Sequence, residues 1–209
     1  MKLDTTLYFI TDSTGLELPE FLRITELALR GGVTLLQLRE KEKSTREYLR
    51  LACAVHEITE KYGVPLIIDD RVDVALACDA EGVHVGQSDM PADIARKLMG
   101  ERKIIGATAK TPSQAKEAFE AGADYLGVGA IYPTTTKVKT VLTTTETLKE
   151  IRRTVPIKVN AIGGLNRTNL DILKGSGIDG ICVVSAIMKS CDPLAESALL
   201  KEAALKLKG

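Results

Sequence analysis

Short apolar runs rich in β-branched residues alternate along the chain with segments whose apolar residues recur at helical spacing. The apolar runs predict eight β-strands, and a segment that can form a helix follows each of them. The expected strands cover residues 7–11, 34–39, 65–69, 82–86, 103–108, 125–131, 157–163 and 180–186. The chain therefore reads as a regular succession of strand–helix units.

The helical signal is clearest over residues 44–62. Ser44 and Glu47 have the spacing of a capping box, in which each residue satisfies a backbone N–H group of the other. Gly63 supplies a C-terminal stop. One face of this segment is apolar and comprises Tyr48, Leu51, Ala52, Val55, Ile58 and Tyr62. The segment is predicted to be an amphipathic helix.

Four of the joints that lead from a helix into a strand look alike. Each has a Gly or Asp where the helix must stop, then a Thr, Glu or Asp, and then the strand. The four joints are GGVTLL (31–36), CDAEGV (78–83), AGADYL (121–126) and SGIDGI (176–181). Their recurrence at about every second unit is typical of a chain built from repeated units.

Strand–helix units without a break in composition predict a parallel sheet. A closed (βα)8 TIM barrel fits the count of strands, whereas a doubly wound open sheet requires that two strands be misread. No G-x-G-x-x-G motif follows the first strand, which argues against a dinucleotide site. We therefore expect a single-domain α/β fold, a (βα)8 barrel over residues 1–209, with residues 132–145 as its long loop and a candidate lid.

Composition limits the classes of molecule that the protein is expected to bind. The chain has 28 basic and 28 acidic residues, which argues against binding nucleic acid by bulk charge. No apolar run approaches the ~20 residues that span a bilayer, and the N-terminal apolar segment is too short for a signal peptide. The four cysteines show no C-x-x-C or zinc spacing. We expect a cytoplasmic protein that acts on small molecules, with no membrane or nucleic-acid partner.

Charged side chains follow several of the expected strands. In a barrel of this kind the chemistry lies at the C-terminal ends of the strands. Arg39 and Lys41 follow the second strand and Lys137 follows the sixth, whereas Asp70 and Asp89 follow the third and fourth. Mg²⁺ usually lies between one or two carboxylates and the phosphates of a substrate. This set of charges suggests a diphosphate substrate with Mg²⁺.

A second anion site is suggested after the seventh and eighth strands, where such barrels commonly hold a phosphate. Gly163, Gly164 and Ser185 lie there, and glycines let backbone N–H groups approach an anion closely. Thr134 and Thr136, in the loop after the sixth strand, add hydroxyl donors next to Lys137. The loop would thus join a monophosphate site to the diphosphate site.

Each of these features has a simpler explanation when it is taken alone. Glycines end strands, an Asp-Asp-Arg run makes a turn or a helix cap, and a threonine run is often a solvated loop. His84 in its apolar strand is better explained as a hydrogen-bonded core residue than as a ligand, and His56 as a structural residue of its helix. The functional interpretation depends on the convergence of all these residues at one end of one barrel.

Taken together, the segments LYFITD, QLREK, DDRVDVA, GVHVGQSDMP, YLGVGAIYPTTTK, NAIGG and VVSAI resemble the thiamine-phosphate synthase family. The combination of Q-x-R-x-K, G-Q-x-D and P-T-x-T-K is specific, although each motif alone is weak. The resemblance implies a (βα)8 barrel enzyme that joins a pyrimidine methyl diphosphate to a thiazole ethyl phosphate and releases pyrophosphate.

The resemblance also implies roles for individual residues. Asp70 and Asp89 would hold Mg²⁺, and Arg39, Lys41 and Lys137 would act on the leaving pyrophosphate. The pyrimidine diphosphate would be bound by Gln37, Arg39, Lys41, Asp69, Thr108 and Lys137, and the thiazole phosphate by Thr134, Thr135, Thr136, Gly164, Val184 and Ser185. Two positions depart from the family pattern, because Asp69 stands where Asn is usual and Thr108 where Ser is usual.

Other functions of the same barrel remain to be distinguished. A thiazole tautomerase relative transfers a proton and needs a positioned base, but it has no use for P-T-x-T-K or paired metal carboxylates. A sugar-phosphate epimerase requires two acid–base groups that face each other across the substrate. A phosphate-binding barrel without turnover would not release pyrophosphate. The sequence leaves a homo-oligomer open.

Overall fold

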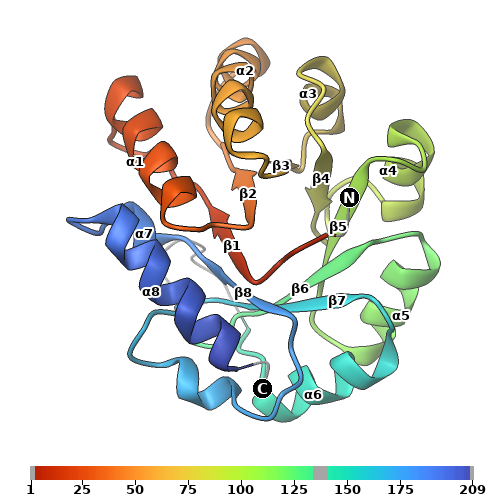
Figure 1. Cartoon of the computed structure of the whole chain (residues 1–209). Helices are drawn as coiled ribbons and strands as arrows, with labels where there is room; N and C mark the ends of the chain where they lie inside the picture. The colour runs from red at the N-terminus through yellow and green to blue at the C-terminus, as the bar shows by residue number, and fades with distance from the viewer. Residues whose placement is uncertain (1–2, 134–140, 208–209) are drawn as a thin grey trace.

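The computed structural model describes residues 3–133 and 141–207 and forms a closed barrel of parallel strands in chain order (Figure 1). The barrel closes because β1 pairs with both β2 and β8. Its strands are β1 (Leu7–Ile10), β2 (Leu35–Leu38), β3 (Leu66–Asp69), β4 (Gly82–Val85), β5 (Ile104–Ala109), β6 (Tyr125–Gly129), β7 (Lys158–Ile162) and β8 (Gly180–Val183). The predicted closed barrel is confirmed, and the open sheet is not.

Helices surround the ring of strands on its outer side (Figure 1). They are α1 (Leu18–Arg30), α2 (Thr45–Tyr62), α3 (Val72–Ala77), α4 (Ala92–Met99), α5 (Pro112–Glu120), α6 (Thr145–Thr154), the 3-10 helix η1 (Leu170–Leu173), α7 (Ser185–Met188) and α8 (Pro193–Lys206). Within the described ranges, no helix has the length and apolar character needed to cross a membrane.

Helix α2 begins and ends as its sequence predicts. Ser44 and Glu47 form the reciprocal capping box, and Gly63 adopts the left-handed conformation with φ 64° at the other end. Tyr48 and Val55 are buried in the core, while Ile58 and Tyr62 are half-buried and pack against it. His56 is also buried, and its Nε2 lies 3.1 Å from Glu81 Oε1, which agrees with a structural role.

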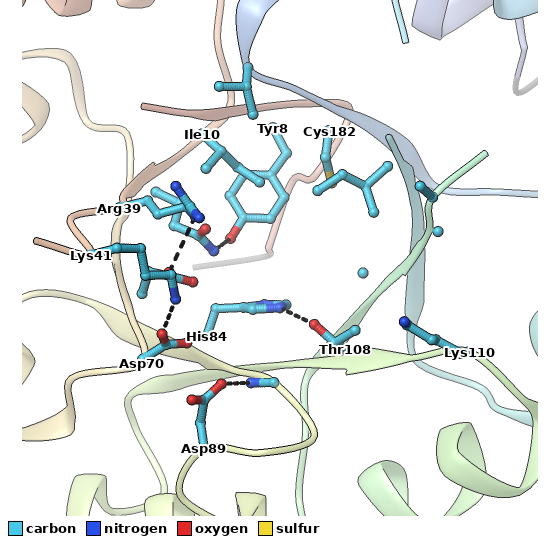
Figure 2. A pocket seen from close by; sticks show the side chains of 18 residues that line it. Tyr8, Ile10, Arg39, Lys41, Asp70, His84, Asp89, Thr108, Lys110 and Cys182 are labelled. Atoms are coloured by element: carbon cyan, nitrogen blue, oxygen red, sulfur yellow. Dashed lines mark hydrogen bonds and ion pairs between the residues drawn. The ribbon is translucent and has the colours of Figure 1, made fainter. Parts of the chain in front are cut away.

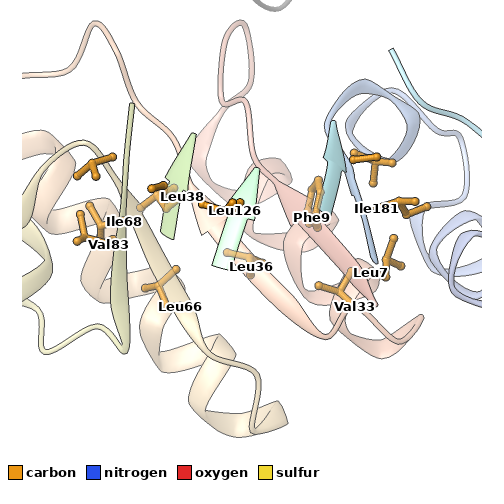
Figure 3. Close-up of a cluster of buried hydrophobic side chains, with 14 of the residues drawn as sticks. Leu7, Phe9, Val33, Leu36, Leu38, Leu66, Ile68, Val83, Leu126 and Ile181 are labelled. Carbon is orange, nitrogen blue, oxygen red and sulfur yellow. The ribbon is translucent and has the colours of Figure 1, made fainter. Parts of the chain in front are cut away.

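The core has two layers because successive side chains of a strand point to opposite faces of the sheet. Leu7 and Phe9 of β1 point outward into the layer between the strands and the helices (Figure 3). Tyr8 and Ile10 point inward and pack inside the barrel. The inward positions nearest the C-terminal ends of the strands are the ones that can face a bound molecule.

The four similar joints share one structural device. In each, the side chain before an even-numbered strand accepts a hydrogen bond from a backbone N–H group at the start of the preceding odd-numbered strand. The bonds run from Leu7 N to Thr34 Oγ1 (3.0 Å), from Leu66 N to Glu81 Oε2 (2.7 Å), from Ile105 N to Asp124 Oδ2 (2.8 Å) and from Val159 N to Asp179 Oδ2 (3.0 Å). This pairing of strands explains why the joints recur in every second unit.

Replacing Asp124 with alanine is expected to lower the free energy of unfolding by about 1–3 kcal/mol, the usual cost of losing a charge-assisted hydrogen bond. Asp124 also binds Arg96 at 2.6 Å, but its side chain is 43% exposed, so the low end of that range is expected. Urea denaturation measures the change. Asp171→Ala removes a carboxylate that is 86% exposed, and it should leave stability unchanged. Equal effects of the two substitutions would contradict the role of the joint.

Candidate active site

A cavity of about 210 Å³ opens at the C-terminal ends of the strands (Figure 2). The sequence predicted this location for the chemistry, and residues from all eight strands line it. The predicted site residues that line the cavity are Gln37, Arg39, Lys41, Asp69, Asp70, Asp89, Thr108 and Val184. The required convergence at one mouth is therefore present for these residues.

The other predicted site residues do not line this cavity or lie outside the described residues. Thr134, Thr135, Thr136 and Lys137 are outside the described ranges. Ser185 is exposed at the start of α7, directly after Val184, and Gly164 is exposed in the loop that follows β7. The proposed monophosphate site thus remains a prediction.

Gly163 and Gly164 have a structural reason to be glycines. Their φ angles are 106° and 64°, in the left-handed region that other residues rarely adopt. A Cβ atom on Gly164 would lie 2.8 Å from Pro133 O, and Tyr132 N donates to Gly163 O at 3.0 Å. The two glycines let the segment after β6 run closely against the loop after β7.

Two of the cations predicted to bind a diphosphate, Arg39 and Lys41, are paired with carboxylates of the same cavity. Lys41 Nζ contacts Asp69 Oδ2 at 2.9 Å and also contacts Asp70, and Arg39 Nε lies 3.7 Å from Asp69 Oδ2. Burial raises the pKa of Asp69, although Lys41 acts in the opposite direction. Burial acts to lower the pKa of Lys41, but Asp69 and Asp70 together raise it. Lys41 therefore stays charged.

Asp70 and Asp89 lie close together at one side of the cavity (Figure 2). Asp70 has a φ of 60°, a conformation that Asp and Asn tolerate better than other side chains, and its N–H donates to His84 O at 2.8 Å. Gly86 N donates to Asp89 Oδ2 at 2.9 Å. The pKa of Asp89 is raised by burial and then by Asp70. A cation beside both carboxylates would relieve this repulsion.

The donor set at Asp70 and Asp89 fits Mg²⁺, which prefers oxygen ligands and keeps positions for water and substrate phosphates. No cluster of three or more His, Cys, Asp and Glu side chains able to hold a metal occurs in residues 3–133 and 141–207. A site of two carboxylates completed by a substrate is consistent with that finding.

His84 belongs to a row of hydrogen bonds across the floor of the cavity. Its Nδ1 lies 3.1 Å from the Tyr125 hydroxyl, and its Nε2 lies 3.0 Å from Thr108 Oγ1. Tyr125 in turn bonds to Tyr8 at 2.6 Å, and Gln37 Nε2 donates to Tyr8 at 2.6 Å. His84 is thus a hydrogen-bonded core residue, as expected, but it also lines the cavity, which sequence reasoning missed.

Lys110 is a further cavity cation that the sequence analysis did not single out (Figure 2). It directly follows β5, as Arg39 directly follows β2. The same strand-end reasoning, applied to position 110, finds it. Tyr8, Ile10 and Cys182 line the cavity as well. The sequence could have indicated this only through the alternation that places these residues on the inner face of the barrel.

Comparison with known proteins gives a consistent result. Residues 7–187 match the model of a family described as thiamine monophosphate synthase. A thiamine-phosphate synthase of Methanobrevibacter smithii is 52% identical over 202 residues, covering 96% of both chains. Another, of Clostridium tetani, is 50% identical over 199 residues, covering 92% of this chain and 95% of that protein. Among solved structures, a thiamine phosphate pyrophosphorylase from Pyrococcus furiosus superposes with a TM-score of 0.86 and 37% identity, covering 98% of this chain and 97% of that chain.

Proposed function

The chain belongs to the thiamine monophosphate synthase family, and on that premise we propose that it joins a pyrimidine methyl diphosphate to a thiazole ethyl phosphate with the help of Mg²⁺. It is an enzyme that forms thiamine phosphate. The observation that carries the proposal is the cavity itself, where Arg39 and Lys41 lie beside Asp70 and Asp89 at one mouth.

The cavity residues divide into two groups by charge. Arg39 and Lys41 would bind the diphosphate. Both now pair with Asp69, and the diphosphate would displace that carboxylate because it carries more negative charge. Asp70 and Asp89 would hold Mg²⁺. The ion, when bound there, supplies charge neutralisation for the diphosphate oxygens.

The reaction would proceed by loss of pyrophosphate before the new bond forms. An aminopyrimidine donates electrons to its methylene carbon, so the carbon–oxygen bond to pyrophosphate can ionise. Arg39, Lys41 and Lys137 would stabilise the negative charge that develops on the departing group. The apolar wall of the cavity, which includes Ile10 and Ile162, would limit access of water to the cation.

No proton has to be removed when the second bond forms. The thiazole nitrogen is a nucleophile that carries no proton, so the reaction needs no general base. His84, the histidine of the cavity, is engaged with Tyr125 and Thr108 and is not required for proton transfer. The thiazole phosphate would bind near Val184, Ser185 and Gly164, with Thr134, Thr135 and Thr136 as further donors.

A coupled assay for released pyrophosphate tests the proposal. Pyrophosphate should form when both phosphorylated substrates and Mg²⁺ are present, and omission of either substrate or of Mg²⁺ should abolish it. Identification of thiamine phosphate by mass completes the measurement. Tight binding of both substrates without pyrophosphate would instead identify a barrel that binds phosphates without turnover.

A further inference from the structure

Five side chains form a continuous hydrogen-bond chain from one side of the cavity floor to the other. It runs from Gln37 on β2 through Tyr8, Tyr125 and His84 to Thr108 on β5, with successive distances of 2.6, 2.6, 3.1 and 3.0 Å. Gln37 and Thr108 line the cavity, whereas Tyr125 does not. Figure 2 shows the bond between His84 and Thr108 at one side and Tyr8 at the other. The chain therefore connects two groups that can touch a bound molecule.

The orientation of the Gln37 amide sets the direction of the hydrogen bonds along the chain. Gln37 Nε2 can only donate to the Tyr8 oxygen, so the single Tyr8 proton is directed to Tyr125. In this orientation Tyr125 donates to Nδ1 of a neutral His84 ring, whose single proton then lies on Nε2 and points to Thr108 Oγ1, at distances of 3.1 and 3.0 Å. At the ends, Gln37 Oε1 is the acceptor and the Thr108 hydroxyl proton is the donor available to a ligand.

The middle of the chain is held rigidly. Tyr125 is 0% and Tyr8 is 1% exposed, and burial raises the pKa of both well above the ordinary tyrosine value, so both keep their protons. Gly106 makes room for this arrangement, because a Cβ atom there would lie 2.1 Å from the Tyr125 ring and 2.6 Å from His84 Nδ1. The hydroxyl groups cannot turn to water for other partners.

The two ends of the chain depend on each other. If the Gln37 amide were turned over, every proton along the chain would reverse, and Thr108 would become an acceptor toward the cavity. While the His84 imidazole is neutral, the ends offer one donor and one acceptor in either direction, and two donors require a second proton on the ring. A ligand that presents two acceptors leaves one buried polar group unpaired, which costs binding energy.

We propose that this chain, with Tyr125 as its buried positioning residue, makes the cavity select a heterocycle with an amino donor toward Gln37 and a ring-nitrogen acceptor toward Thr108. The inference rests on the proposed function, since an aminopyrimidine has this pattern across its ring. A 4-oxo analogue has acceptors at both places and is rejected. Removing the Tyr125 hydroxyl lets the two ends orient independently.

The kinetic test compares kcat/KM for the amino substrate and its 4-oxo analogue in the wild type and in Tyr125→Phe. The ratio of kcat/KM for the amino substrate to kcat/KM for the analogue should be about tenfold lower in the variant than in the wild type, which is the scale of one buried hydrogen bond. The lower intrinsic reactivity of the analogue is common to both enzymes and cancels. Tyr48→Phe is the matched control, because the Tyr48 hydroxyl is buried but bonds to backbone oxygens outside the chain, Leu38 O at 2.7 Å and Asp69 O at 3.2 Å. Its discrimination should equal that of the wild type.

A spectroscopic test needs no active-site variant. The sequence has two histidines, so the ring ¹⁵N chemical shifts of His84 can be assigned with a His56→Gln variant. The proton is expected on Nε2 of His84, with Nδ1 as the acceptor. A proton on Nδ1 would overturn the inference, even if Tyr125→Phe fails to fold.

The outcomes separate the inference from the proposed function. Normal turnover of the amino substrate, together with discrimination in Tyr125→Phe within twofold of the wild type, overturns the inference alone. Absence of turnover of the amino substrate by the wild type overturns the proposed function, and the selectivity with it.

Discussion

Replacing Lys137 with alanine is expected to lower kcat about 100-fold or more, on the scale of losing one group that stabilises charge in a transition state. Lys137 ends the P-T-x-T-K motif, a few residues after Ala130, which lines the cavity. The proposed reaction requires the ammonium group of Lys137 to act on the departing pyrophosphate, whose negative charge grows as the bond breaks. The effect should therefore appear in kcat and not only in KM. Steady-state kinetics with both substrates varied measures it.

Lys139→Ala is the control for this substitution. Lys139 lies two residues further along the same segment and carries the same charge, but it is not part of the motif. Its replacement should change kcat by less than about threefold. An equal loss in both variants, or a loss below about threefold in Lys137→Ala, would remove Lys137 from the mechanism.

Replacing Asp70 with asparagine is expected to raise the Mg²⁺ concentration needed for half-maximal activity about tenfold or more. Mutation of a residue that hydrogen-bonds to a metal ligand typically lowers metal affinity 10–100-fold. Loss of a ligand itself should lower the affinity at least as much. Asparagine is the suitable replacement because Asp70 has a φ of 60°, which Asn also tolerates, so the substitution removes charge without adding backbone strain. Titration of activity with Mg²⁺ gives the measurement.

Asp73→Asn provides the matched control. Asp73 is three positions away and pairs with Arg71 at 2.6 Å, and its side chain is 59% exposed. Its replacement should leave the Mg²⁺ requirement unchanged. If Asp70→Asn keeps the Mg²⁺ dependence of the wild type, Asp70 is not a ligand of the ion.

The candidate site shows where strand-end reasoning succeeds and where it stops. It brought Arg39, Lys41, Asp70 and Asp89 together, because all strands of a closed parallel barrel end at the same mouth. It did not indicate that Lys41 contacts Asp69 and Asp70 directly. Which charges pair depends on side-chain directions at the mouth, and no short window of sequence contains that information.

Closure of the barrel, which pairs β1 with β8, was favoured over an open sheet by the count of eight strands. The number of strands, their order along the chain and the capped start of α2 were determined by the sequence itself. These features follow from alternation, helical spacing and capping residues such as Ser44, all of which act over a few neighbouring positions. Only the tertiary structure decided two other features. These are the hydrogen bond that Asp124 accepts at its joint and the row of side-chain hydrogen bonds that links Gln37 to Thr108. Their partners lie on other strands, so the contacts exist only after the barrel has closed and each strand has taken its register.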